Sequence, residues 1–233
     1  ENASRSSYFG IVDLCGIPKD RYYLYKSYWN TEETTVHILP HWNWPDREGQ
    51  ITPVFVYTNG DCAELFVNGV SQGKKCKNPK SSNSVERFRL MWNEVVYEPG
   101  ELKVVAYSGG KEIGTSTLKT AGKPYALRLT PDRKTIHADG EDLSYILIEA
   151  VDKEGNLCPL VMDQVDIKLS GNGSIAGVGN GNPQSFNAFQ SNQVELFYGK
   201  AMLIVKSGFE KGEIKAQLTA KGLKGATTDL KVE

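Results

Sequence analysis

Residues 57–75, YTNGDCAELFVNGVSQGKK, decide the fold class of this chain. At their centre, Asn68 and Gly69 both tolerate the positive φ angles that a type I′ turn requires. Every second residue before this turn is apolar, namely Ala63, Leu65 and Val67. A helix is disfavoured, because each glycine in the stretch would cost it about 1 kcal/mol relative to alanine. The stretch therefore predicts a β-hairpin.

The same kind of signal continues on both sides of the hairpin. From Val36 onward, short extended runs are separated by Gly, Asn, Asp and Pro, which is typical of antiparallel sandwiches. The predicted strands outside the hairpin are 51–58, 88–92, 102–107, 112–118, 127–129, 144–150, 165–169, 202–206 and 214–218. A Gly- and Pro-containing break at 120–124 predicts a linker. We expect an all-β protein: two immunoglobulin-like β-sandwiches in tandem, residues 36–121 and 122–233, preceded by a short helical segment.

Residues 1–35 differ from the rest of the chain. Residues 17–29 predict a helix, since Pro18 suits the first turn. Tyr22, Tyr25 and Trp29 fall at positions i, i+3 and i+7, on one face of that helix. Two interpretations are open: the helix packs on its own β-domain, or its natural partner lies elsewhere. We expect all three aromatic residues to be covered by the first sandwich or by a second copy of the chain.

The overall composition excludes several classes of partner. The formal net charge of -1 gives no electrostatic reason to expect nucleic acid or an anionic membrane. No apolar run approaches the roughly 20 residues that span a bilayer. The first residues lack the apolar region of a signal peptide, so we expect the chain to be a fragment of a longer protein.

The four cysteines do not form a metal-binding pattern. Cys62 and Cys76 flank the Asn68–Gly69 turn almost symmetrically, so a cross-strand disulfide is one outcome. We expect free thiols instead, because the two positions are offset by one residue and a bulge at Gly73 would disturb the pairing. The compartment stays open on this basis.

Several motifs fit structural explanations better than chemical ones. His37 and His41 are four apart, but Pro40 favours extended chain, in which they lie about 13 Å apart, so we expect no metal site. The glycine-rich run 171–183 has no GxGxxG spacing and does not open a helix, so we expect tight turns and no nucleotide cofactor. The acidic stretches 139–142 and 152–156 lack the alternating ligands of an EF-hand and are interpreted as turns.

Two tryptophans raise the question of carbohydrate binding. Trp42 and Trp44 stand beside polar residues, and a sugar ring packs well on an aromatic face. The alternative is that they fill the core or a domain junction, which we favour because Trp is usually largely buried. No pair of carboxylates, no nucleophile elbow and no nucleophile with an adjacent histidine marks an active site. We therefore expect no catalytic residues.

Several stretches together resemble the C-terminal part of bacterial β-galactosidases of glycoside hydrolase family 2. They cover nearly the whole chain: residues 13–25 (DLCGIPKDRYYLY), 36–44 (VHILPHWNW), 57–73, 97–107 (YEPGELKVVAY), 138–145 (ADGEDLSY) and 177–183 (GVGNGNP). The resemblance implies that residues 1–35 are the end of a (β/α)₈ catalytic barrel with its last helix and a linker. Tyr22, Tyr25 and Trp29 would then face that barrel. The final domain is similar to the Ig-like modules of invasins.

The resemblance also implies a function. The two catalytic glutamates of the family match no position here, so we expect accessory domains that are inactive alone and need no cofactor. The expected partner is an N-terminal catalytic barrel of the same chain, with carbohydrate, or a second copy bound through the exposed helix, as further candidates. Alternative functions are a carbohydrate-binding module that uses Trp42 and Trp44, with Trp92 as a further candidate, or an adhesion or spacer segment. The sequence itself leaves the localisation unknown, and the resemblance implies a periplasmic or secreted bacterial protein.

Overall fold

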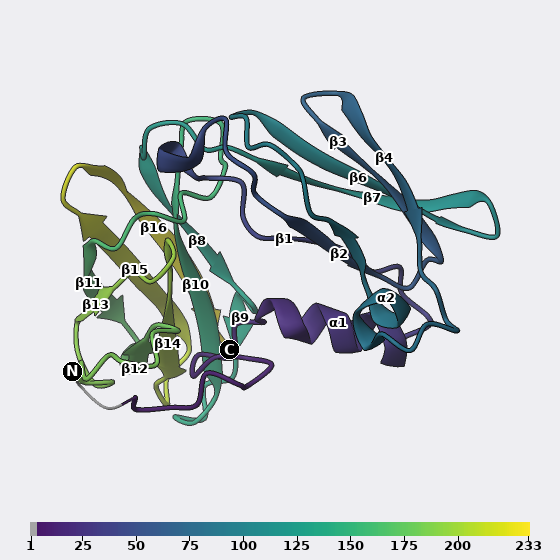
Figure 1. Ribbon diagram of the computed structural model, residues 1–233. Coiled ribbons are helices and arrows are strands. Elements are labelled where there is room, and N and C mark those ends of the chain that lie inside the picture. Colours follow the sequence, from purple (N-terminus) through teal and green to yellow (C-terminus); the bar gives the residue numbers. More distant parts are fainter. Residues whose placement is uncertain (1–3) are drawn as a thin grey trace. The chain divides into compact units, whose positions relative to one another are not determined.

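The computed structural model describes residues 4–233, and the expectation of a mostly β protein is confirmed. The chain divides into two compact units (Figure 1). Residues 18–120 form the first unit, and residues 121–233 form the second together with residues 4–17. No helix of the described part is long and apolar enough to cross a membrane.

The first unit has two antiparallel sheets around one core. Its elements are α1 (Asp20–Trp29), β1 (Val36–Leu39), the 3₁₀ helix η1 (Pro45–Arg47), β2 (Val54–Thr58), β3 (Cys62–Val67), β4 (Val70–Cys76), α2 (Ser84–Phe88), β5 (Leu90–Trp92), β6 (Glu101–Ser108) and β7 (Lys111–Lys119). The strand orders are β1–β2–β5 and β4–β3–β6–β7. Side chains from both sheets share one buried cluster, including Val56, Leu65, Trp92 and Val104.

The predicted hairpin is confirmed as β3 and β4. Asn68 and Gly69 have φ angles of 48° and 81°, and Val67 pairs with Val70 across the turn. The residues that alternate in β3 are buried on one side, where they meet β6 and the core, while Glu64 and Phe66 are only partly covered. Period-two burial therefore sets which face of the hairpin points inward.

The expectation of free thiols at Cys62 and Cys76 is wrong, because the structure joins them in a disulfide. The register of the hairpin shifts between Glu64 and Phe66, and Gly73 on the opposite strand has a φ of +92°. This one-residue bulge brings Cys62 directly opposite Cys76. The bulge that we expected to separate the cysteines is what aligns them.

The helical predictions are correct in type and incomplete in number. Helix α1 begins at Asp20, two residues after Pro18, so Pro18 precedes the helix rather than occupying its first turn. Helix α2 lies directly before the predicted strand 88–92 and includes its first residue, where no helix was predicted. Asn83 caps it by accepting a hydrogen bond from the backbone N–H of Val85. Five residues are too few to show a helical period, which is why the sequence did not reveal α2.

The second unit follows one continuous strand path instead of two separate sheets. Its strands are β8 (Ala126–Pro131), β9 (Thr135–Ile136), β10 (Leu143–Val151), β11 (Gln164–Gly171), β12 (Gly173–Gly179), β13 (Gln193–Glu195), β14 (Lys200–Ser207), β15 (Gly212–Ala220) and β16 (Leu223–Val232). They pair in the order β12–β14–β10–β8–β16–β15–β11–β13, with β9 beside β16. A single parallel bridge between Lys224 and Ala126 joins the two halves, so the sheet is nearly closed on itself.

Strand β12 corrects the interpretation of the glycine-rich run. Residues 173–179 pair with β14 and are not a series of tight turns. Glycine is required here by close neighbours: a Cβ at Gly173 would lie 2.6 Å from the carbonyl oxygen of Lys206. Strands β9, β13 and β16 were also not predicted, since they are short or rich in polar residues.

The residues that precede β1 are divided between the two units. Residues 4–17 group with the second unit, whereas α1 and the residues that follow group with the first. The interpretation of residues 1–35 as the end of a catalytic barrel stays a prediction. So do the proposed domain limits.

The disulfide gives a first test. Replacing both cysteines, C62S with C76S, should lower the free energy of unfolding of the first unit by about 3 kcal/mol, because the closed loop then regains chain entropy when it unfolds. Urea unfolding would measure this. Dithiothreitol should reproduce the loss in the wild type and leave the double variant unchanged. A titration that finds four free thiols in the unreduced, unfolded chain would contradict the pairing.

Candidate functional site

One face of helix α1 is fixed to its own sheet. The Tyr23 ring stacks on the His37 ring of β1 with centroids 3.9 Å apart. His37 Nε2 lies 2.7 Å from Oδ1 of Asp20 in the first turn of the helix. These contacts agree with the interpretation that α1 packs on its own β-domain, and they set the rotation of the helix.

The predicted aromatic face of α1 is only partly covered. Tyr22 and Tyr25 are half-buried, whereas Trp29 is 77% exposed. The first sandwich therefore leaves Trp29 uncovered, and its coverage by a second copy of the chain stays a prediction. Its ring stacks on Tyr25 with centroids 4.8 Å apart and planes 9° from parallel. The result is a flat aromatic surface at the C-terminal end of α1.

The two candidate sugar-binding tryptophans have different environments. Trp42 is completely buried, and its Nε1 donates a hydrogen bond to the carbonyl of Glu98. This burial favours the packing alternative for Trp42. Trp44 is partly exposed, and its ring stacks on His41 at 4.3 Å. Burial lowers the pKa of His41 below its ordinary value. Sugar binding by Trp42 and Trp44 stays a prediction.

The acidic stretches are turns, as expected. Asp139 Oδ1 accepts hydrogen bonds from the backbone N–H groups of Glu141 and Asp142. Asp142 accepts from the backbone of His137 and from Arg133, and these bonds lower its pKa to about 2. The Asp152 carboxylate likewise accepts hydrogen bonds from the backbone N–H groups of residues 122, 154 and 156. Within residues 4–233, no group of three or more His, Cys, Asp or Glu side chains converges as metal ligands would.

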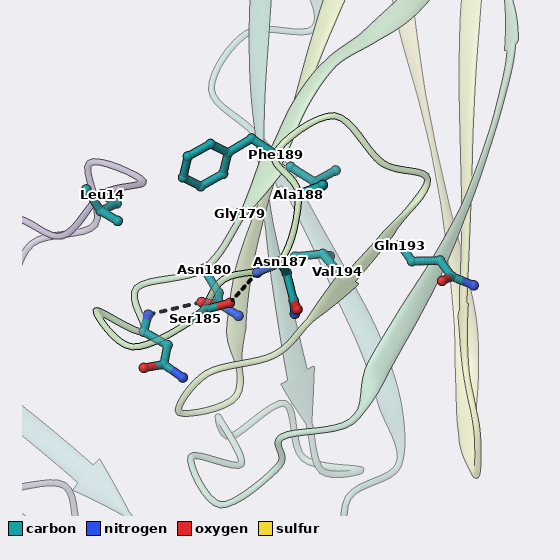
Figure 2. A pocket seen from close by; sticks show the side chains of 11 residues that line it. Leu14, Gly179, Asn180, Ser185, Asn187, Ala188, Phe189, Gln193 and Val194 are labelled. Atoms are coloured by element: carbon teal, nitrogen blue, oxygen red, sulfur yellow. Dashed lines mark hydrogen bonds between the residues drawn. The ribbon is translucent and has the colours of Figure 1, made fainter. Parts of the chain in front are cut away.

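A small hollow in the second unit lies beside the loop that follows β12 (Figure 2). Leu14, Gly179, Asn187 and Phe189 are among its lining residues. Its volume of about 20 Å³ has room for a water molecule and is far too small for a sugar ring. The hollow itself is therefore not a substrate pocket.

The leading segment 4–17 forms one wall of this hollow. Arg5 donates from its backbone N–H to the Pro183 carbonyl and from Nη1 to the Asn187 carbonyl, over 2.7 and 3.0 Å. The Arg5 guanidinium also lies 4.3 Å from the centre of the Phe189 ring. Sequence analysis missed this contact, because an irregular segment carries no periodic signal and its partner is 182 residues away.

Two further residues of the leading segment, Cys15 and Asp13, lie against the end of β12 and the start of the loop that follows it. A Cβ on Gly179 would lie 3.0 Å from the Cys15 sulfur, and a Cβ on Gly181 would collide with the Asp13 carboxylate. Burial, and secondarily the charge of Asp13, raise the pKa of Cys15 to about 12. The thiol is therefore protonated near neutral pH and acts as a small packing group.

Two known protein families together match most of this chain. The family described as glycoside hydrolase family 2 C-terminal domain 5 matches residues 127–229. A second family, described only as a domain of unknown function, matches residues 49–114. The chain belongs to glycoside hydrolase family 2, as part of the C-terminal region of its members. The resemblance noted in the sequence is confirmed.

Individual relatives agree with this family 2 assignment. The β-galactosidase BoGH2A of Bacteroides ovatus is 44% identical over 231 residues, which are 99% of this chain and 26% of that protein. A β-glucuronidase of Formosa agariphila is 30% identical and matches 95% of this chain and 22% of its own length. The crystal structure of a β-glycosidase from Bacteroides vulgatus superposes with a TM-score of 0.90 at 33% identity, covering 98% of this chain and 28% of that one. The family 2 region thus spans about a quarter of the length of these relatives.

The exposure of Trp29 can be measured directly. Of the four tryptophans, Trp42 and Trp92 are buried and Trp44 is partly covered, so acrylamide should quench mainly Trp29. Substituting Trp29→Phe should remove most of the quenchable fluorescence. The matched Trp92→Phe variant should retain it. An unchanged Stern–Volmer slope in Trp29→Phe would show that α1 is covered.

The turn held by Asp142 should depend on pH. Its folded pKa of about 2 lies below the ordinary 3.8, so its charge stabilises the fold above about pH 4, and this contribution is lost as the pH falls through about 2. Asp142→Asn should therefore lower the melting temperature of the second unit near pH 7. The difference in melting temperature between Asp142→Asn and the wild type should become smaller as the pH falls from about 5 to about 2. A difference independent of pH would count against the ionic role.

Proposed function

We propose that this chain is a non-catalytic accessory region of a family 2 glycoside hydrolase that supports a catalytic (β/α)₈ barrel. The names of the relatives, β-galactosidase and β-glucuronidase, support a β-glycosidase as the parent activity. The matched region is about a quarter of each relative, which leaves ample length for a catalytic domain. The substrate of the parent enzyme is part of this proposal.

Both β units fit an immunoglobulin-like description. The first has seven strands in a three-stranded and a four-stranded sheet over a common core, which is the size of one such sandwich. The second is one nearly closed sheet whose two halves are joined by a short parallel bridge, and in the proposal these halves serve as the two layers of a sandwich. In the proposal these sandwiches are residues 36–121 and 122–233, and residues 1–35 are the end of the barrel with its last helix.

The aromatic surface of α1 carries the proposal. The stacked Tyr25 and Trp29 rings leave a large apolar area in water, whereas such residues normally gain by being buried. The hydrogen bond between Asp20 and His37 and the Tyr23 stack hold the opposite face on the sheet, so the exposed face is presented in one orientation. A barrel that packs on this face would cover Trp29.

The acidic residues support a non-catalytic role. Asp13, Asp139, Asp142 and Asp152 each accept backbone hydrogen bonds in turns, which occupies the oxygens that an acid or a nucleophile would need. In the proposal, the glutamate pair that cleaves the glycosidic bond belongs to the barrel. The chain alone should then hydrolyse no chromogenic β-galactoside.

Fragment complementation tests the proposal. The Bacteroides ovatus β-galactosidase would be truncated before the matched region, and the missing activity would be restored either by its own segment, as the positive control, or by this chain. We expect this chain to restore turnover, and Trp29→Ala to require at least about tenfold more protein for the same effect, since a buried Trp is a typical interface anchor. Phe209→Ala, which removes an exposed ring of the second unit, is the matched control.

Three results would contradict the proposal. The first is turnover of the galactoside by this chain alone. The second is restoration by the Bacteroides ovatus segment but not by this chain. The third is equal restoration by the wild type and by Trp29→Ala.

A further inference from the structure

The loop between β12 and β13 has an unusual composition. Residues 180–192, NGNPQSFNAFQSN, contain six Asn or Gln residues among thirteen and no charged residue. The two aromatic rings of this loop reach solvent, since Phe186 is 58% exposed and Phe189 is 46% exposed. Amides and exposed aromatic rings without charge are the groups that recognise neutral sugars, because the rings pack on C–H faces and the amides bond hydroxyls.

Several polar side chains of the loop make no hydrogen bond with the described part of the protein. Asn180 and Asn182 stabilise the start of the loop by accepting backbone hydrogen bonds, as Figure 2 shows for Asn180. The side-chain amides of four others make no hydrogen bond with any described residue: Gln184, Asn187, Gln190 and Asn192. These amides are available to a ligand.

An open hollow of about 210 Å³ adjoins the loop. Asn187 and Ser191 line it from the loop, and Gln193 and Glu195 line it from β13. Glu195 is the one charged residue of this described lining, and a carboxylate accepts hydrogen bonds from sugar hydroxyls. The hollow is smaller than a typical drug-sized pocket, so it suits contact with one ring of a longer chain.

The position of the loop also points to a saccharide. Residues 4–17 contact it through Arg5 and Asp13, and Cys15 lies against Gly179 directly before it. If α1 is the last helix of a catalytic barrel, the segment directly before it is a βα loop, and βα loops form the active-site face of such barrels. Loop 180–192 would then lie at the rim where the substrate enters.

We propose that loop 180–192 binds a neutral saccharide, with Phe186 and Phe189 packing on its rings and the free amides bonding its hydroxyls. That this saccharide is the part of the substrate beyond the cleaved bond rests on the proposed function. The binding itself does not, because every group named lies in this chain. A neutral saccharide is favoured over an acidic one, because the loop itself carries no cation and the guanidinium of Arg5 is already engaged by the Asn187 carbonyl and the Phe189 ring.

The test is a titration of the 233-residue chain, followed by ¹H–¹⁵N NMR. The probes are two neutral tetrasaccharides, β-1,4-galactotetraose and cellotetraose, with tetragalacturonic acid as the charged comparison. We expect at least one neutral probe to shift the amides of residues 180–195 with a Kd on the order of 1 mM, a modest affinity of about 4 kcal/mol. Phe186→Ala and Phe189→Ala should each raise this Kd by about fivefold or more.

A matched control exists in the same unit. Phe209 is 81% exposed and follows β14, whose last residue pairs with the first residue of β12, whereas loop 180–192 leaves the other end of β12. Phe209→Ala should leave the Kd unchanged, and the NMR spectrum of each variant reports directly whether it is folded. Rescue of binding by Phe186→Tyr would separate ring stacking from a structural role.

Four results would overturn the proposal. They are no shifts up to about 20 mM of either neutral probe, shifts confined to residues outside 180–195, equal losses of affinity in Phe209→Ala, and stronger binding of tetragalacturonic acid than of both neutral probes. Complementation without saccharide binding would refute this inference but not the accessory role. Saccharide binding without complementation would refute the accessory role but not this inference.

Discussion

The contact between Asp13 and Gly181 ties the leading segment to the second unit. Asp13 Oδ1 accepts hydrogen bonds from the backbone N–H groups of Cys15 and Ile17, at 2.8 and 2.9 Å, which makes a rigid turn. That turn reaches the loop after β12 only because residue 181 has no Cβ. Near the start of the segment, Arg5 donates a hydrogen bond to the Asn187 carbonyl and covers one side of the Phe189 ring. The neighbourhood of loop 180–192 depends on this packing.

The fold shows how far alternation carries a prediction. The hairpin and most long strands follow from period-two burial, and the Asn68–Gly69 turn follows from its tolerance of positive φ. The Cys62–Cys76 bond did not follow, because the sequence suggests a bulge at Gly73 but not that its one-residue shift of register cancels the offset between the two cysteines. Strand β12 was hidden for another reason: close packing against Lys206 and Ile214 demands a glycine at position 173, and glycines by themselves suggest turns.

The candidate sites were predictable only where spacing is informative. The i, i+3, i+7 pattern of Tyr22, Tyr25 and Trp29 correctly marks one helix face, but exposure depends on what the helix meets. Trp42 and Trp29 make the same point, because one is fully buried with its indole nitrogen bonded to Glu98 and the other lies in solvent. The wall formed by residues 4–17 could not be foreseen, since it joins segments far apart in the sequence without any regular pattern.

Hydrogen–deuterium exchange of the chain mixed with the truncated Bacteroides ovatus β-galactosidase would test the central claim most directly. If the family 2 region is a support for a catalytic barrel, amides of α1 should become strongly protected on mixing, while those of β15 and β16 should exchange as before. Unchanged exchange throughout α1 in a complex that demonstrably forms, with protection elsewhere, would contradict the account.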